Sequence, residues 1–489
     1  MIRAKIDYIQ SMKNEIELIT PDNFEQDNHF YPKALNSQLH PIVNHFFNLS
    51  PERIIKRYLH LNPQVNEETL REILAYQPKH FYWGGSDLFY VTTENGNRKM
   101  VVLETNSCPS GQKSMPPRSD YDEHRGYRFL LENAFLPALK KKKKLPKGAL
   151  AVVYDKNYME TSGYAQTLSD LTNENVYLVP HFNNLDQHLR FENGVMLVKT
   201  PEGEEVPIRA AIRYVTQKPW NRIPTVTKTF ICNSTLVCLS GGRNKLLANK
   251  AYELFNSEIG ESGLKINMPE TIKDVSKPEI PLWVQRFGGK AVIKNPYSNA
   301  GQGVWTITNE KELEAFMEGE YTYDQFIVQS LIGHFDWSST SQHGKFFHVG
   351  TVPNLKGNIF ISDLRVMICA SPNGFIPCAM YARRARTPLE SEIKGSSWEV
   401  LGTNLSVKLA ENQWDSETSR LLLMDRKDFN SLGIGIDDLV EAFIQTTLTV
   451  IAIDKMAKNL ISSKGAFRMK LFKSLDNDET LINEIVVSS

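Results

Sequence analysis

The sequence predicts a multi-lobed α/β protein, and three patterns along the chain lead to that prediction. The stretch 148–181 runs as strand, helix and strand, an order typical of a parallel α/β unit. Two β-like runs within 86–105 are joined by Asn95 and Gly96, the strongest short signal for a β-hairpin. Between 244 and 329 helices and strands alternate around a glycine-containing loop, as in a compact α+β lobe.

The remaining elements follow from the same signals in chain order. Two helices are expected near the N-terminus, at 51–61 and 66–75, the second with an Asn-Glu-Glu start. Strands are expected at 86–93, 98–105, 148–155, 174–181, 289–295, 304–307, 325–329, 359–370 and 375–382. Further helices are expected at 158–171, 244–255, 310–317 and 437–458. A final hairpin of strands 466–473 and 479–487 is expected to close the chain.

Chain length predicts several lobes. At 489 residues the chain is too long for a single hydrophobic core. We expect an N-terminal lobe with the hairpin at 1–146, a Rossmann-like lobe at 147–240, a lid lobe at 241–335 and a C-terminal lobe at 336–489. The Rossmann-like lobe lacks the GxGxxG pattern, so nothing marks it as a dinucleotide site.

Charge and cysteine content restrict the expected partners. The chain has 56 basic and 56 acidic residues, so nucleic acid is not an expected partner. Five cysteines form no CxxC pair, which is typical of reduced thiols in a cytosolic protein. No apolar stretch reaches the length of a membrane span. We therefore expect a cytoplasmic protein without a nucleic-acid or membrane partner, and a homodimer is left open.

A lysine and a glycine loop predict a phosphate-binding lid. Lys294 ends an apolar strand, and Ser298, Asn299, Gly301 and Gly303 belong to the loop that follows it. Small residues let backbone N–H groups approach phosphate oxygens, and the lysine offers a mobile positive charge. The alternative for the glycines alone is an ordinary turn between two strands. The pattern is not that of a Walker A loop, which opens a helix.

The earlier hairpin carries a candidate magnesium site. Glu104 and Asn106 are two apart on one strand, so their side chains leave the same face about 6 to 7 Å apart. Asp87 on the partner strand can join them across the hairpin. Carboxylate and amide oxygens suit Mg²⁺, which takes its other ligands from water and substrate phosphates. The alternative is a solvent-exposed polar strand face.

Arginines on the later strands are candidates for binding anions. Arg365 shares a strand face with Asp363, and Arg383 and Arg384 follow on a second strand. Guanidinium groups bind carboxylate and phosphate through two parallel hydrogen bonds. A basic rim making ordinary ion pairs is the alternative. Cys108 is expected to be a small buried side chain rather than a nucleophile.

Residues 241–333 resemble the ATP-grasp superfamily. The resemblance lies in the "NK" start of the first helix, the lid around Lys294 and the apolar strand that ends at Gln329. It implies an ATP-grasp fold in which Lys245 and Lys294 reach the ATP phosphates. The strand end at Gln329 and the backbone of Ser330 and Leu331 would then meet the adenine edge. Members usually have an acidic residue where Ser330 stands.

The hairpin is similar to one in eukaryotic-type glutathione synthetase and glutathionylspermidine synthase. Five residues match that pattern: Asp87, Glu104, Asn106, Ser107 and Ser110. Common ATP-grasp enzymes carry the E-x-N hairpin at the C-terminal end, so its early place here implies a circularly permuted site. The family often has an arginine two residues before the aspartate, where this chain has Gly85.

The resemblance also implies how substrates are held. Ser107, Ser110, Arg213 and Arg384 are the expected substrate contacts, because Arg213 stands where such enzymes hold an acidic or peptidic substrate. In the family an arginine near this part of the chain touches the γ-phosphate, which makes Arg365 and Arg383 the expected catalytic residues. Asn404 is expected to line the same cleft. The closing hairpin offers Glu484 as a reserve metal ligand, although Lys470 and Val486 replace the usual aspartate and asparagine.

The implied activity is that of an ATP-dependent carboxylate–amine ligase using ATP and Mg²⁺. A small-molecule carboxylate would become an acylphosphate, and an amino-acid-like or peptide-like amine would then displace phosphate to form an amide. Two other functions remain open: a catalytically silent nucleotide-binding protein, and a kinase that stops at the phosphorylated product.

Overall fold

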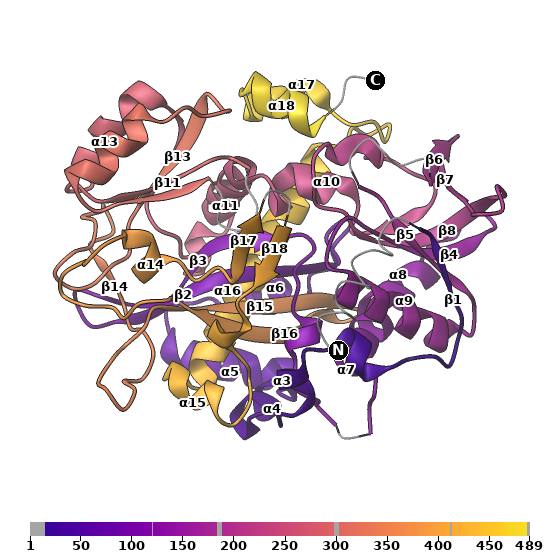
Figure 1. The fold of residues 1–489 in the computed structure, drawn as a ribbon, viewed down its shortest axis with the longest axis horizontal. Helices are drawn as coiled ribbons and strands as arrows, with labels where there is room; N and C mark the ends of the chain where they lie inside the picture. Colours follow the sequence, from indigo (N-terminus) through magenta and orange to yellow (C-terminus); the bar gives the residue numbers. More distant parts are fainter. Residues whose placement is uncertain (1–14, 120, 183–187, 298–302, 411–412, 487–489) are drawn as a thin grey trace.

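A central sheet separates a lid lobe from a Rossmann-like lobe, which lie on opposite sides of the molecule in Figure 1. The computed structural model describes residues 15–119, 121–182, 188–297, 303–410 and 413–486. In these ranges the strands form a six-stranded central sheet, a four-stranded lid sheet, a seven-stranded sheet in the Rossmann-like lobe and a two-stranded ribbon. The structure therefore has the mixed α/β architecture that the sequence predicted.

The central sheet joins the two ends of the chain. The predicted hairpin, β2 (Trp83–Thr93) and β3 (Arg98–Asn106), pairs through β2 with β15 (Ser362–Ser371) from the last third of the sequence. The sheet continues through β16 (Gly374–Arg384) to β19 (Leu421–Leu422), and β14 (Phe346–His348) pairs with β2 on the other side. All the pairings are antiparallel. Successive side chains in these strands therefore alternate between two faces.

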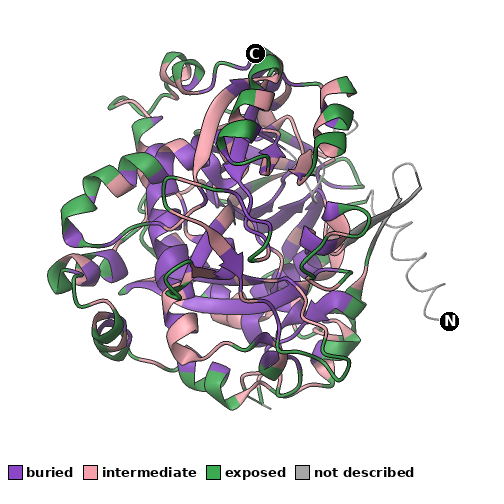
Figure 2. Cartoon of the chain, turned by 90° about the vertical axis from the view of Figure 1, so that its left-hand side faces the viewer, coloured by how far each residue is buried: buried purple, intermediate pink, exposed green. Residues whose placement is uncertain are grey.

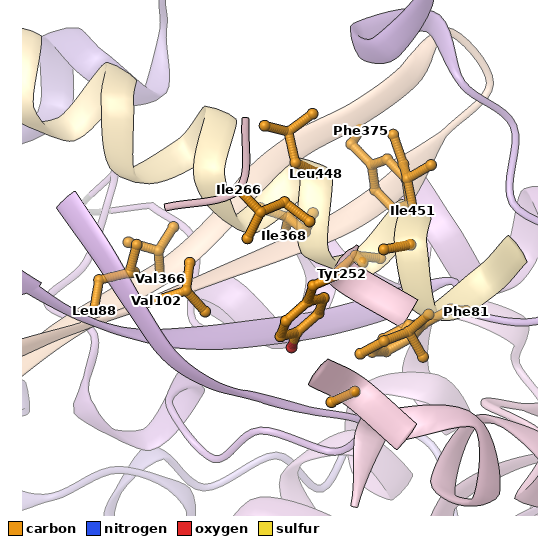
Figure 3. Packing of buried hydrophobic residues seen from close by; sticks show 14 of the residues in the cluster. Phe81, Leu88, Val102, Tyr252, Ile266, Val366, Ile368, Phe375, Leu448 and Ile451 are labelled. Carbon is orange, nitrogen blue, oxygen red and sulfur yellow. The ribbon is translucent and has the colours of Figure 1, made fainter. Parts of the chain in front are cut away.

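The apolar face of the central sheet packs on α16 (Ile436–Asn459), which confirms the helix predicted at 437–458. Figure 3 shows side chains from the strands meeting side chains of the helix in this layer: Leu88, Val102, Val366, Ile368, Leu448 and Ile451. Ser86 lies on the same face as Leu88. Its hydroxyl is hydrogen-bonded to that of Thr105 at 2.8 Å and to that of Thr449 on the helix at 2.9 Å. No described helix is long and apolar enough to cross a membrane.

Three helices near the N-terminus cover the other side of α16. They are α4 (Pro41–Phe47), α5 (Pro51–Leu61) and α6 (Glu67–Ala75), and the last two lie where the sequence predicted helices. Ser50 and Asn66 cap the starts of α5 and α6 by accepting hydrogen bonds from backbone N–H groups of the first turn. Figure 2 shows buried strands and helix faces inside the molecule and exposed helix faces around them.

The lid sheet has the strand order β10 (Thr271–Ser276), β13 (Gln325–Ser330), β11 (Ala291–Lys294) and β12 (Val304–Ile307). Its outer face buries Ala291, Ile293 and Val328 in one apolar cluster with side chains from α12 (Ile280–Arg286) and α13 (Glu310–Glu318). Alternation then turns Val292 and Lys294 to the inner face. The predicted strands at 289–295, 304–307 and 325–329 and the helix at 310–317 are all present.

The Rossmann-like lobe has a parallel core of four strands: β4 (Ala149–Tyr154), β5 (Val176–Pro180), β8 (Glu205–Tyr214) and β9 (Phe230–Cys232). The chain leaves β4 through α9 (Tyr158–Thr172) to β5 on one side, and later returns to β8 on the other side. Antiparallel strands β1 (Glu17–Ile19), β6 (Leu189–Glu192) and β7 (Val195–Lys199) extend the sheet at its edges.

The expectation of a closing hairpin is wrong. Residues 466–486 instead contain two short helices, α17 (Met469–Leu475) and α18 (Glu479–Ile485). Leu481, Ile482 and Ile485 are all buried against the main core, and this spacing places them on one face of a helix rather than of a strand. Asp478 caps α18 by accepting a hydrogen bond from the N–H of Leu481 at 2.9 Å.

Asp454 of α16 anchors the segment that leads into β2. Its carboxylate is fully buried and accepts hydrogen bonds from the backbone N–H groups of Lys79, His80 and Phe81 and from the hydroxyl of Tyr76. Because removal of an acceptor leaves buried N–H groups without partners, we expect Asp454→Ala to lower the free energy of unfolding by at least about 2 kcal/mol. Urea titration followed by circular dichroism measures this change.

The matched control is Asp437→Ala at the start of the same helix. Asp437 is 44% exposed and pairs with Arg57, so its removal should cost no more than about 1 kcal/mol. Equal destabilisation by the two variants would contradict the anchoring role of Asp454.

Candidate active site

A cavity of about 840 Å³ lies between the polar face of the central sheet and the inner face of the lid sheet. Its walls also include the start of α11 (Lys245–Glu258) and the carboxyl ends of β4 and β8. Most of the predicted site residues line it: Asp87, Glu104, Asn106, Ser110, Lys245, Lys294, Gln329, Ser330, Leu331, Arg365, Arg383 and Asn404. Residues from distant parts of the sequence are therefore gathered around one volume.

Strand register explains why the polar side chains of the central sheet meet. Asp87 lies opposite Glu104 in the β2–β3 pair and opposite Arg365 in the β2–β15 pair. Directly opposed residues in an antiparallel pair share a face, so all three side chains leave the sheet together. Arg383 is opposite Asp363 on the same face. These side chains point away from α16 and into the cavity.

Asp87 is held by two arginines. Arg365 donates from Nε and Nη2 to the two oxygens of Asp87 at 2.5 and 2.6 Å, and Arg383 donates to the same carboxylate at 2.7 Å. Burial alone would raise the pKa of Asp87, but the two guanidinium groups hold that pKa well below its usual value. Arg383 also forks onto Asp363. The carboxylates therefore fix the arginines in place before any ligand binds.

Glu104 and Asn106 present oxygens to the middle of the cavity. Lys245 Nζ lies 3.7 Å from a carboxylate oxygen of Glu104, and the Asn106 amide donates to the other at 3.3 Å. Burial would raise the pKa of Glu104, but Lys245 holds that pKa below its usual value, so the carboxylate is ionised at neutral pH.

These oxygen donors fit the chemistry of Mg²⁺, which prefers carboxylate and amide oxygens and completes its shell with water and phosphate. Asp87 and Asn106 fit less directly. Both oxygens of Asp87 already accept from Arg365, and the amide oxygen of Asn106 accepts from Arg243 at 3.3 Å. Among the described residues no cluster of three or more acidic, histidine or cysteine side chains could hold a metal ion.

Lys294 projects from the lid sheet toward Glu104. Val292, Lys294, Val304, Thr306 and Gln329 share the inner face, since strand pairing sets Lys294 opposite Val304 and Val292 opposite both Thr306 and Gln329. Burial lowers the pKa of Lys294 to about 8, and the neighbouring Glu104 opposes this shift. The ammonium group has no hydrogen bond or ion pair to any described side chain.

Part of the predicted glycine loop falls outside the described residues. Ser298, Asn299 and Gly301 belong to that part. Gly303 is described and has a φ of +65°, and a Cβ there would meet the side chain of Asn295 at 2.6 Å. The position therefore requires glycine for the turn itself, whereas Val304 is the next residue to line the cavity.

The strand end expected to meet adenine already has hydrogen-bond partners. The N–H of Ser330 donates to Glu270, and the N–H and carbonyl of Leu331 both bond to Ser339. Gln329 donates from its amide to Thr271 at 2.8 Å. A base contact through these backbone N–H groups would need a rearrangement of Ser339, so this part of the expectation stays a prediction.

Three of the expected substrate contacts do not line the cavity. Arg213 is buried and donates to the carbonyls of Asn233 and Val215, because it closes the chain turns after β8 and β9. Ser107 is buried against the thiol of Cys238. Arg384 lies over the ring of Phe360. Of the expected substrate contacts, Ser110 is the one that lines the cavity.

The reserve metal ligand is also remote from the cavity. Glu484 lies on α18, where it pairs with Lys218 and accepts a hydrogen bond from the hydroxyl of Tyr323 at 2.5 Å. Both partners contact the same carboxylate oxygen of Glu484 and link the C-terminal helices to the rest of the chain. The hairpin Glu104 therefore remains the candidate ligand.

Sequence reasoning missed a second group of lining residues. Lys156 and Arg243 line the end of the cavity next to the Rossmann-like lobe. Glu160 supports that wall, because its buried carboxylate accepts from the hydroxyl of Ser110 and from the N–H groups of Gly111 and Gln112. Lys156 directly follows a parallel strand, the usual place for ligand contacts in such sheets, and this signal could have found it.

Comparisons with known proteins found similar solved structures. No protein-family model and no curated protein matches the chain. A glutathione synthetase-like effector from Globodera pallida has a similar solved structure, with 7% identity, a TM-score of 0.37 and coverage of 71% of this chain and 86% of the other.

Two further solved structures are similar over shorter parts of the chain. A RimK domain ATP-grasp protein from Sphaerobacter thermophilus has 12% identity and a TM-score of 0.28, and the match covers 47% of this chain and 90% of the other. A carboxyaminoimidazole ribonucleotide synthase from Aspergillus clavatus, in complex with ATP, has 10% identity and a TM-score of 0.28, with coverage of 51% and 71%. Each of these similarities has a TM-score below 0.5.

Proposed function

We propose that the protein is an ATP-dependent carboxylate–amine ligase of the ATP-grasp type. The observation that carries this proposal is the pairing of opposite chemistries across one cavity. Lys294 on the lid sheet and Lys245 on α11 supply positive charge, and both lie beside the Glu104 carboxylate of the central sheet. Such an arrangement suits a polyphosphate that arrives with a divalent cation.

Each group has a role in this proposal. Lys245 and Lys294 bind the phosphates of ATP, and Val292 offers the base an apolar surface on the lid. Glu104 and Asn106 would hold Mg²⁺, with Asp87 beside them. The bound ion would neutralise charge on the phosphate oxygens. Arg365 faces the same space and stabilises negative charge that develops on the transferring phosphoryl group.

The proposed reaction needs no covalent nucleophile from the protein. A substrate carboxylate oxygen attacks the γ-phosphorus, the bond to the β-phosphate oxygen breaks, and an acylphosphate and ADP result. An amine nitrogen then attacks the acyl carbon, phosphate leaves, and the amine loses a proton. Cys108 fits a structural role, because its thiol donates to the carbonyl of Arg213 and burial raises the thiol pKa.

A second candidate is a silent nucleotide-binding protein or a kinase. The observation that favours it is the engagement of Asp87 by Arg365 and Arg383, which occupies a candidate metal ligand. Coupled assays separate the candidates. A ligase releases ADP and phosphate only when an acid and an amine are both supplied, and mass spectrometry detects an amide. A kinase yields a phosphorylated product alone, and a silent protein binds ATP without turnover.

Loss of the Glu104 carboxylate should remove activity but not the fold. We expect Glu104→Ala to lower turnover by at least about a hundredfold, because the charged oxygen ligand in the centre of the cavity is lost. ADP release measured with a coupled assay, together with the thermal unfolding midpoint, tests this. Glu94→Gln is the control, since Glu94 is exposed at the turn of the same hairpin. Normal turnover in Glu104→Ala would disprove the assignment of the hairpin site.

Lys294 should contribute to nucleotide affinity. We expect Lys294→Met to weaken binding of a fluorescent ATP analogue by about 10- to 100-fold, the range for loss of a hydrogen bond to a charged group. Lys311→Met serves as the control, because Lys311 is exposed on α13 of the same lobe and does not line the cavity. Equal affinity in the two variants would argue against a lid that binds phosphate.

A further inference from the structure

The cavity continues past Asn106 to the carboxyl ends of β4 and β8. These strands are parallel neighbours, and the chain leaves β4 toward β5 on one side and later returns to β8 on the other. In open parallel sheets the crevice outside such a reversal is the usual place for a ligand. Lys156 follows β4, Gln217 follows β8, and both line the cavity there.

Contacts on both sides fix the backbone around Lys156. The buried carboxylate of Asp155 accepts from the N–H groups of Thr216 and Gln217 at 2.6 and 2.5 Å. Asn157 donates from its amide to the Tyr214 hydroxyl at 2.8 Å and accepts from Lys113 at 2.6 Å. The hydrogen bonds of Asp155 and Asn157 therefore hold the turn that carries Lys156, and the Lys156 side chain makes none of them.

Lys156 and Arg243 carry positive charge that the protein leaves without an anion. The ammonium group of Lys156 makes no hydrogen bond or ion pair with any described residue. Arg243 donates only to two neutral oxygens, of Asn106 and of Cys108, both at 3.3 Å, and its buried Nε has no partner in the described structure. Burial and the nearby Arg243 lower the pKa of Lys156 to about 7, and the neighbouring Asp155 opposes this shift.

The net charge of the whole cavity also favours binding of a second anion. Among the described lining residues, cations outnumber carboxylates seven to three, the carboxylates being Asp87, Glu104 and Asp363. ATP with one bound divalent cation is a dianion, so it would balance only part of the excess. Lys156 and Arg243 are two cations at the end of the cavity next to the Rossmann-like lobe, where Arg243 contacts Asn106.

We propose that Lys156 and Arg243 bind the acid substrate, and that this substrate is an organic dianion with a second anionic group besides its reacting carboxylate. Gly85 stands where the resemblance places an arginine. In this proposal the anion is instead bound by residues of the Rossmann-like lobe and of the start of α11. The inference rests on the proposed ligase function. It assigns the two ends of one cavity to two anions, with Glu104 and Asn106 between them.

The test is a titration of the full chain saturated with Mg²⁺ and a non-hydrolysable ATP analogue. Isothermal calorimetry compares acetate with the dianions succinate and glutarate. For the unchanged chain we expect at least one dianion to bind about tenfold tighter than acetate, and Lys156→Met to remove that preference. Lys156→Arg should restore part of it. The matched control is Lys147→Met, because Lys147 is exposed just before β4.

Nucleotide affinity separates this proposal from the proposed function. Lys156→Met should bind the fluorescent ATP analogue as the unchanged chain does, whereas Lys294→Met should not. Three results would overturn the inference: no preference for dianions in the unchanged chain, an intact preference in Lys156→Met, or a loss of nucleotide affinity in Lys156→Met equal to that of Lys294→Met. Failure of the unchanged chain to bind nucleotide would instead count against the ligase function, and dianion binding would then be measured without nucleotide.

Discussion

The backbone pairing of β2 with β15 is the contact on which the candidate site depends. It sets Asp87 opposite Arg365 and turns Leu88 and Val366 toward α16. A shift of one residue would exchange the two faces, placing the carboxylate in the apolar core and the leucine in the cavity. The burial of the apolar face on α16 therefore selects the register, and the register assembles the polar site.

The lining of the cavity carries a net positive charge, which anionic ligands would neutralise. Asp87 and Asp363 partly neutralise the arginines of the central sheet and hold their guanidinium groups in a fixed orientation. Ligand binding therefore requires no reorientation of these groups. Lys294 and Lys156 have no such partner among the described residues and lie at two separate parts of the wall. The proposed nucleotide and the proposed acid substrate would therefore bind at different parts of the cavity.

The lid and the C-terminal helices show how the rest of the fold supports this arrangement. Asp478 accepts from the N–H groups of Asp324 and Gln325 at the start of β13, and Asp476 accepts from Asn244 at the start of α11. The last helices therefore hold the start of α11, which carries Lys245, and the start of β13, which pairs with the strand that carries Lys294. Their structural role also explains why Glu484 faces Lys218 instead of the cavity.

The sequence by itself determined most elements and the fold class, because periodicity and turn residues such as Asn95-Gly96 act over short distances. It also identified the lysine of the lid and the carboxylates of the hairpin as candidates, since their neighbours in the chain mark them. Only the tertiary structure decided that 466–486 contains two helices packed on the core, that Arg213 closes chain turns and that Lys156 lies near Arg243 in the cavity. Those outcomes depend on contacts between residues far apart in sequence, which local patterns do not encode.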